Sequence, residues 1–191
     1  MRLHNGIVLR TGILLAAAIT AVAVATFSAS AAPARTAGGN GAVVSHGTLM
    51  QLNDSGVQGT VTLVEHNGQI RANLQATGLE PMQMHMQHIH GFSDGVQATC
   101  PDMSLAGADG VLSFAEGLPA YGPVQVTLGH DMVDGSTLQF SRTFAATDAG
   151  AAVGTLGSLD QYVIVVHGLT VAGTFDMTLP VACAVLTING A

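Results

Sequence analysis

The strongest constraint on the fold is a pair of alternating polar and apolar segments on either side of Asn67-Gly68. Residues 60–64 alternate before this dipeptide, and residues 70–74 alternate after it. Asn-Gly favours a tight turn with positive φ at both central residues, so these segments predict a β-hairpin. Further strand-like runs occupy 84–90, 123–128, 137–145, 161–167, 172–178 and 181–188, and no amphipathic helix of useful length is evident. Many short strands and 24 Gly residues predict an all-β sandwich or barrel.

Composition excludes two classes of protein. The 191 residues include 5 Arg, no Lys and 12 acidic residues. A nucleic-acid-binding protein needs clustered basic residues to neutralise phosphates, so no nucleic-acid partner is expected. Disordered chains are rich in charge and poor in apolar residues, whereas this chain is 9% charged and 48% hydrophobic.

The N-terminal segment has the layout of a secretory signal peptide. Two arginines precede an apolar run over 12–27, and small residues follow over 28–34. The alternative is a membrane anchor, but the run is shorter than the ~20 residues that span a bilayer. We therefore expect cleavage after Ala31 or Ala34, no membrane attachment afterwards, and a protein secreted to the extracellular space or to the periplasm and cell envelope.

Domain organisation follows from this interpretation. We expect a signal peptide over 1–31, a flexible leader over 32–42 and one domain over 43–191. In an exported chain the two cysteines, Cys100 and Cys183, most simply form one disulfide, the alternative being two free thiols.

A histidine-rich segment is the main candidate for chemistry. On a strand, residues two apart share a face, so His88 and His90 lie on one side together with Met82, Met84 and Met86. Two imidazoles on one face suit a transition metal, although an isolated His-x-His pair is also common as surface or core histidine. A second apolar strand, 161–167, delivers His167 at its end.

At this point the sequence resembles the copper/zinc superoxide dismutases. The segments that carry the resemblance are 58–61 with the Asn67-Gly68 turn and Gly78-Leu79, His85-Met86-Gln87-His88-Ile89-His90, Cys100, Val165-Val166-His167 and Ala182-Cys183-Ala184-Val185-Leu186. The resemblance implies a Greek-key β-barrel with His88, His90 and His167 as copper ligands. It also implies that His85 is a structural histidine behind the site, and that Cys100 and Cys183 form the intrachain disulfide.

The sequence departs from this family at three places. No histidine occurs over 101–108, so the bridging histidine and the zinc ligands are missing and zinc is not expected. Asp109-Gly110-Val111 resembles the start of the strand that follows the family's zinc loop, and the chain from there to His167 is longer than in the family. Pro180 stands where the family has its active-site arginine.

Other residues offer auxiliary contacts. Thioethers suit Cu(I), so Met86 is a possible copper contact as well as a possible packing residue, whereas Met82 is expected in the core. His130 is a conceivable fourth ligand, with a surface turn as the alternative, and His46 and His66 are expected to face solvent.

Residues 109–116 resemble the second half of a calcium loop, ending at Glu116. Its first and third positions are Leu105 and Gly107, which supply no side-chain oxygen, so calcium is not expected. We expect a turn-rich connection over 116–123 to follow it.

Three functions remain open. The leading hypothesis is a secreted superoxide-dismutase-like domain with a copper-only or vestigial site, whose partners are a metal ion and, if it is an enzyme, superoxide. Against activity, an anionic substrate needs a positive guiding field, and the chain after the signal peptide keeps three arginines against 12 acidic residues. The alternatives are a non-catalytic exported copper-binding or buffering protein and a structural secreted β-domain with a decayed site.

Overall fold

A computed structural model describes residues 41–145 and 156–188 of the chain. The predicted signal peptide, its cleavage site and most of the leader lie outside these residues. Among the described residues, no helix combines the length and apolar character needed to cross a membrane.

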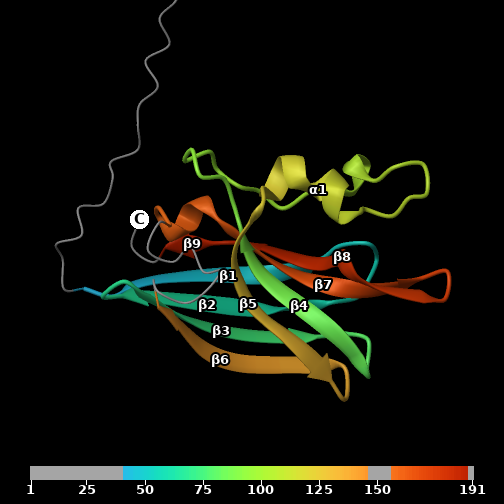
Figure 1. Cartoon of the computed structure of the whole chain (residues 1–191), viewed down its shortest axis with the longest axis horizontal. Coiled ribbons are helices and arrows are strands. Elements are labelled where there is room, and N and C mark those ends of the chain that lie inside the picture. Colours follow the sequence, from blue (N-terminus) through green and yellow to red (C-terminus); the bar gives the residue numbers. More distant parts are fainter. Residues whose placement is uncertain (1–40, 146–155, 189–191) are drawn as a thin grey trace, which may run out of the picture. The chain divides into compact units, whose positions relative to one another are not determined.

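Antiparallel strands form almost all of the described structure (Figure 1). They are β1 (Val43–Gln51), β2 (Gln58–His66), β3 (Gln69–Thr77), β4 (Gln83–His90), β5 (Val124–Val133), β6 (Thr137–Ala145), β7 (Val163–Val171), β8 (Thr174–Val185) and the short β9 (Thr187–Ile188). The hydrogen-bonded order is β5-β4-β7-β8-β1-β2-β3-β6, with β9 beside β1. Consecutive strands β3 and β4 are therefore far apart in the sheet, and β6 returns to pair with β3. This crossover pattern confirms the predicted Greek-key barrel.

The Asn67-Gly68 hairpin also forms as predicted. Both residues have positive φ, 51° and 73°, and His66 pairs with Gln69 across the turn. In contrast, the two strands predicted over 172–178 and 181–188 are largely one strand, β8. Strand β8 continues through Pro180, which pairs with His167 of β7. The pairing of the two strands is irregular on both sides of His167, and proline, which has no backbone N–H, is accommodated at such an irregularity.

Two apolar clusters hold the domain together. The larger fills the barrel and includes Leu63, Leu74, Ile89 and Val166, all at most 1% exposed. The smaller lies on the outer face of β7, where Val163 and Val165 point away from the barrel; its other members are Leu52, Ala98, Leu112, Tyr121 and Cys183. A segment between β4 and β5 covers this outer face (Figure 1).

The covering segment contains a helix that the sequence analysis missed. It contains η1 (Met103–Leu105) and α1 (Phe114–Tyr121), so the predictions of a strand start at residues 109–111 and of an irregular connection over 116–123 are wrong. Ser113 caps α1, and its side chain and that of Glu116 form a reciprocal capping box. Eight residues that include Gly117 and Pro119 are too few to show a helical period, which is why the helix escaped detection.

The predicted disulfide is confirmed and joins the covering segment to the barrel. Cys100 precedes η1, and Cys183 lies on β8 with a Cα–Cα distance of 5.6 Å. The bond therefore fastens the segment between β4 and β5 to a strand on the same outer face.

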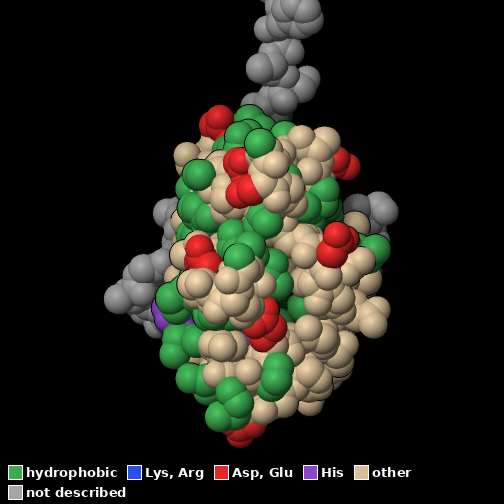
Figure 2. All heavy atoms as spheres, turned by 90° about the vertical axis from the view of Figure 1, so that its right-hand side faces the viewer, with side chains coloured by type: hydrophobic (Ala, Val, Ile, Leu, Met, Phe, Trp, Pro, Cys, Tyr) green, Lys and Arg blue, Asp and Glu red, His purple; other side chains and the backbone are tan. Residues whose placement is uncertain are grey.

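The surface carries little positive charge. Figure 2 shows one face with scattered acidic side chains in red and no blue of Lys or Arg. Among the described residues, Arg71 and Arg142 are the only basic ones apart from histidine. Arg71 donates to Ser141, and Arg142 is engaged in the ion pair with Asp131.

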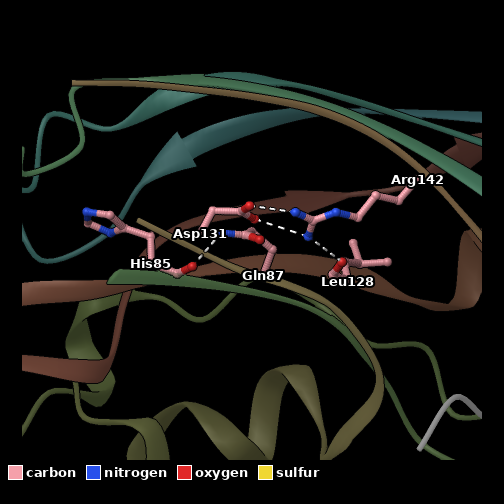
Figure 3. Close-up of polar contacts among 5 residues, drawn as sticks. All are labelled: His85, Gln87, Leu128, Asp131 and Arg142. Atoms are coloured by element: carbon pink, nitrogen blue, oxygen red, sulfur yellow. Dashed lines mark hydrogen bonds and ion pairs between the residues drawn. The ribbon is translucent and has the colours of Figure 1, made fainter. Parts of the chain in front are cut away.

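That ion pair spans the seam between β5 and β6, the two ends of the hydrogen-bonded order (Figure 3). Nη2 of Arg142 donates to Oδ1 of Asp131 at 2.5 Å, and Nη1 donates to Oδ2 of Asp131 at 3.1 Å. Nη1 also donates to the carbonyl of Leu128 at 3.0 Å. Leu128 is the extra residue of a β-bulge in β5, opposite the step from Gln87 to His88. Because a bulged residue lies outside the ladder, Arg142 supplies the partner that its carbonyl would lack.

Candidate metal site

Three histidines converge between the barrel and the covering segment. His88 and His90 lie two residues apart on β4, and His167 lies on the neighbouring strand β7. One possible ligand atom from each residue lies within 4.8 Å of the other two. His90 and His167 are fully buried, and His88 is 7% exposed, so His88 is the only one of the three that keeps any contact with solvent.

The sheet register explains this convergence. His88 pairs with Val165, so His88 and the residues at 163, 165 and 167 on β7 share the outer face. The alternate residues Ile89, Ile164 and Val166 point into the barrel core. Alternation along β4 and β7 places Ile89, Ile164 and Val166 in the core. The same alternation therefore places all three histidines together outside the barrel core.

Each histidine presents a buried nitrogen without a hydrogen-bond partner. These atoms are Nδ1 of His88, Nε2 of His90 and Nε2 of His167. Buried polar atoms are normally satisfied, so three such orphaned nitrogens in one place call for a shared partner. One transition-metal ion bound by three imidazoles fits this donor set, and the three residues are those that the sequence analysis selected.

The opposite ring nitrogens of two ligands are fixed by the backbone. Nδ1 of His90 donates to the carbonyl of Gly122 at 2.8 Å, and Nδ1 of His167 donates to that of Thr178 at 2.9 Å. A hydrogen bond of this kind fixes the tautomer and turns the lone pair of Nε2 towards a metal.

Burial keeps these imidazoles neutral. Desolvation, with a smaller contribution from the neighbouring histidines, lowers the pKa of His88 to about 4 and that of His167 to about 3. Desolvation also lowers the pKa of His90 to about 4, although the hydrogen bond to Gly122 opposes the shift. At neutral pH all three lone pairs are therefore free to bind a metal.

Two aromatic residues of α1 line the site, and the sequence analysis did not identify them. The ring of Tyr121 lies 4.6 Å from that of His90, and Phe114 lies 5.9 Å from His90 and 6.1 Å from His167. Tyr121 donates its hydroxyl to the carbonyl of Phe114, which ties the two ends of the helix. The sequence feature that could have predicted the helix carrying these two rings is the Ser113-x-x-Glu116 capping box at its N-terminus.

His85 lies on the opposite face of β4 and is fully buried. Its Nδ1 is 3.0 Å from the carbonyl of His167, and its Nε2 is 3.0 Å from that of Glu80. His85 thus bridges the backbone of one candidate ligand and the loop before β4.

The auxiliary candidates flank the three histidines. Met86 is half-buried and pairs with His167 on one side and with His130 on the other. His130 is exposed on strand β5 rather than in a turn, and its ring centroid lies 6.4 Å from that of His88. Met82, which was expected in the core, is 68% exposed, because it precedes β4 in a turn with positive φ.

The remaining candidates take no part in this site. His66 is exposed, and His46 is half-buried with Nδ1 3.0 Å from the hydroxyl of Thr62. In the calcium-like segment, the carboxylate of Glu116 accepts hydrogen bonds from the backbone N–H and the hydroxyl of Ser113, so it caps helix α1.

Comparisons with known proteins add the following findings. Neither a family model nor a curated protein matches the chain. The chain is similar to solved structures of superoxide dismutase 5 from Candida albicans. A mutant of that protein has 13% identity and a TM-score of 0.45, with 78% of this chain and 90% of that chain covered. Its Cu(II) form has 11% identity and a TM-score of 0.43, with coverages of 78% and 95%.

Proposed function

We propose that the chain binds one copper ion through His88, His90 and His167 and serves to hold copper outside the cytoplasm. The observation that carries this proposal is the set of three buried, unpartnered imidazole nitrogens at one point. Neutral imidazoles suit both copper and zinc, and the thioether of Met86 beside them favours copper. The disulfide supports an oxidising compartment, in line with the signal-peptide pattern.

The second candidate is superoxide removal at the same copper. It is favoured by the family resemblance of the histidine segments and by the partial exposure of His88, which leaves the edge of the site within reach of a small molecule. Copper, when bound, would supply one-electron chemistry between its two oxidation states. The chain's own groups would hold and shield the site. Within residues 41–145 and 156–188, the two arginines are bonded to Ser141, Asp131 and Leu128, and neither is placed to attract an anion to the histidines.

Metal analysis tests the first proposal. The purified chain is loaded with copper or zinc, dialysed and analysed for bound metal, and the Cu(II) form is examined by electron paramagnetic resonance. We expect one copper per chain and nitrogen hyperfine structure. Replacing His88 and His167 with Asn should abolish both, whereas His66→Asn, an exposed control, should leave both intact. Retention of copper by the double variant would show that the ligands are elsewhere, and preference for zinc would exclude the copper assignment.

A superoxide assay separates the two candidates. Copper-loaded protein that removes superoxide no faster than the His88→Asn/His167→Asn variant is a copper-binding protein only. Faster removal that depends on these two histidines establishes the enzyme.

A further inference from the structure

A row of sulfur-containing side chains lies next to the three histidines on the outer face of β4 and β5. Met84 pairs directly with Met132, and Met86 pairs directly with His130. Directly paired residues of antiparallel strands share a face. The residues that alternate with Met84 and Met86 on β4, His85 and Gln87, are fully buried on the inner face, so these four side chains lie outside the barrel.

Packing does not account for these four residues. Met132 is 58% exposed, His130 is exposed, and Met84 and Met86 are half-buried. Burial of apolar area is what stabilises a methionine in a folded protein, and an exposed one gains little from it. The apolar clusters of the described residues include none of them.

Their spacing suits a soft metal ion. Paired Cβ atoms on facing strands are about 5 Å apart, and residues two apart on one strand are about 7 Å apart. Methionine has three rotatable bonds, so sulfur atoms at these positions can converge on one ion. Thioethers select Cu(I) among the biological metals, and imidazole also binds copper.

The row is continuous with the buried site. Met86 pairs with His130 on β5 and with His167 on β7, so it stands between an exposed imidazole and a buried one. The ring of His130 is 6.4 Å from that of His88, the ligand that is partly exposed. An ion held on the surface row would therefore lie next to His88, the only one of the three histidines that keeps any exposed area.

We propose that Met84, Met86, Met132 and His130, here called the methionine–histidine patch, form a surface Cu(I) site through which the buried site is loaded. The transfer is an exchange of thioether ligands for imidazoles, and copper stays in the same oxidation state throughout. The loading half of this proposal rests on the proposed function, whereas binding at the patch does not.

Binding is tested on the full wild-type chain with Ag(I), a diamagnetic ion of the same charge and softness as Cu(I). Methionine methyl resonances are followed by NMR during the titration. We expect those of Met84, Met86 and Met132 to shift together and to saturate at one ion per patch. Met50, which is 66% exposed on β1, serves as the control and should not shift. If the three patch methionines do not respond, or respond no more than Met50, the patch is not a metal site.

Loading is tested by kinetics. Cu(I) is offered from a soluble chelator, and arrival at the buried site is measured in the wild type, in a Met84→Leu/Met132→Leu variant and in the Met50→Leu control. Leucine keeps the approximate volume, and a circular dichroism spectrum checks the fold. We expect the Met84→Leu/Met132→Leu variant to load at least about tenfold more slowly, an effect of about 1.4 kcal/mol on the barrier, and to reach the same final stoichiometry.

Equal loading rates in the Met84→Leu/Met132→Leu variant and the wild type would overturn the loading role. Failure of the proposed function would look different. The His88→Asn variant would then bind as much copper as the wild type, while the Ag(I) shifts of the patch would be unaffected.

Discussion

Acid should destabilise the metal-free protein steeply, because it contains three buried neutral histidines. Burial lowers the pKa of His88 and His90 from 6.5 to about 4 and that of His167 to about 3. Between these values and 6.5, the unfolded chain binds protons that the folded chain does not. Stability is therefore complete above pH 6.5 and is lost as pH falls towards 4.

The magnitude follows from the number of protons. One proton bound only by the unfolded state changes the free energy of unfolding by about 1.4 kcal/mol per pH unit, and three change it by about 4 kcal/mol per pH unit. Part of the pKa shift of His88 and of His167 comes from repulsion by the neighbouring histidines, so the three groups do not titrate independently. The slope of the free energy of unfolding against pH should therefore lie between the values for one proton and for three. Over two pH units the loss is at least about 3 kcal/mol, a large share of the 5–15 kcal/mol typical of a domain.

The assay is urea unfolding of the metal-free chain at pH 6.5, 5.5 and 4.5, a range in which most carboxylates remain ionised. His90→Asn removes one titrating group and keeps a donor for the carbonyl of Gly122, so it should reduce the slope. His66→Asn, at an exposed position, should leave the slope unchanged. If the free energy of unfolding of the wild type is constant over this range, the three imidazoles are not buried and neutral.

Three further predictions concern the frame that holds the site. Reducing the Cys100–Cys183 disulfide, which closes a loop with a sequence separation of 83, should lower the free energy of unfolding by about 4.5 kcal/mol in the chain-entropy model; an unchanged urea midpoint would contradict this. A double-mutant cycle with Arg142→Met and Asp131→Asn should give a coupling of about 1–3 kcal/mol in unfolding experiments, because the pair is partly buried and doubly hydrogen-bonded; a coupling near zero would show that it does not stabilise the seam. Gly129→Ala places a methyl group against the Arg142 guanidinium and should cost about 1–3 kcal/mol in the wild type but less in the Arg142→Met background, and equal costs in both would refute this contact.

Local patterns predicted much of the fold. Asn67-Gly68 specified a hairpin through its backbone conformation, and strand alternation directed His88 and His90 to one face. The pairing of β4 with β7, which adds His167, spans more than 70 residues, so only the family resemblance suggested it. A local sequence pattern does not indicate which of two strands so far apart in the sequence will pair.

The missed features depend on contacts between distant residues. Tyr121 and Phe114 line the site only because α1 packs over β7, and a helix of eight residues has too little periodicity to predict. His130 resembled a turn residue because Gly129 precedes it, yet the bulge at Leu128 keeps this stretch within β5. Met82 belongs to the apolar pattern of β4 but lies before the strand begins, where its side chain remains exposed.

The order of the strands also determines when the site comes into existence. Its ligands lie on β4 and β7, which are separated in sequence by the covering segment, β5 and β6. Bringing β4 and β7 together costs chain entropy before their contacts form, and folds rich in such non-local strand pairing form slowly. A nascent chain therefore offers a metal only the local His88 and His90 pair. The complete histidine set is a late product of folding, so a metal ion that needs all three imidazoles can bind only after the chain has folded.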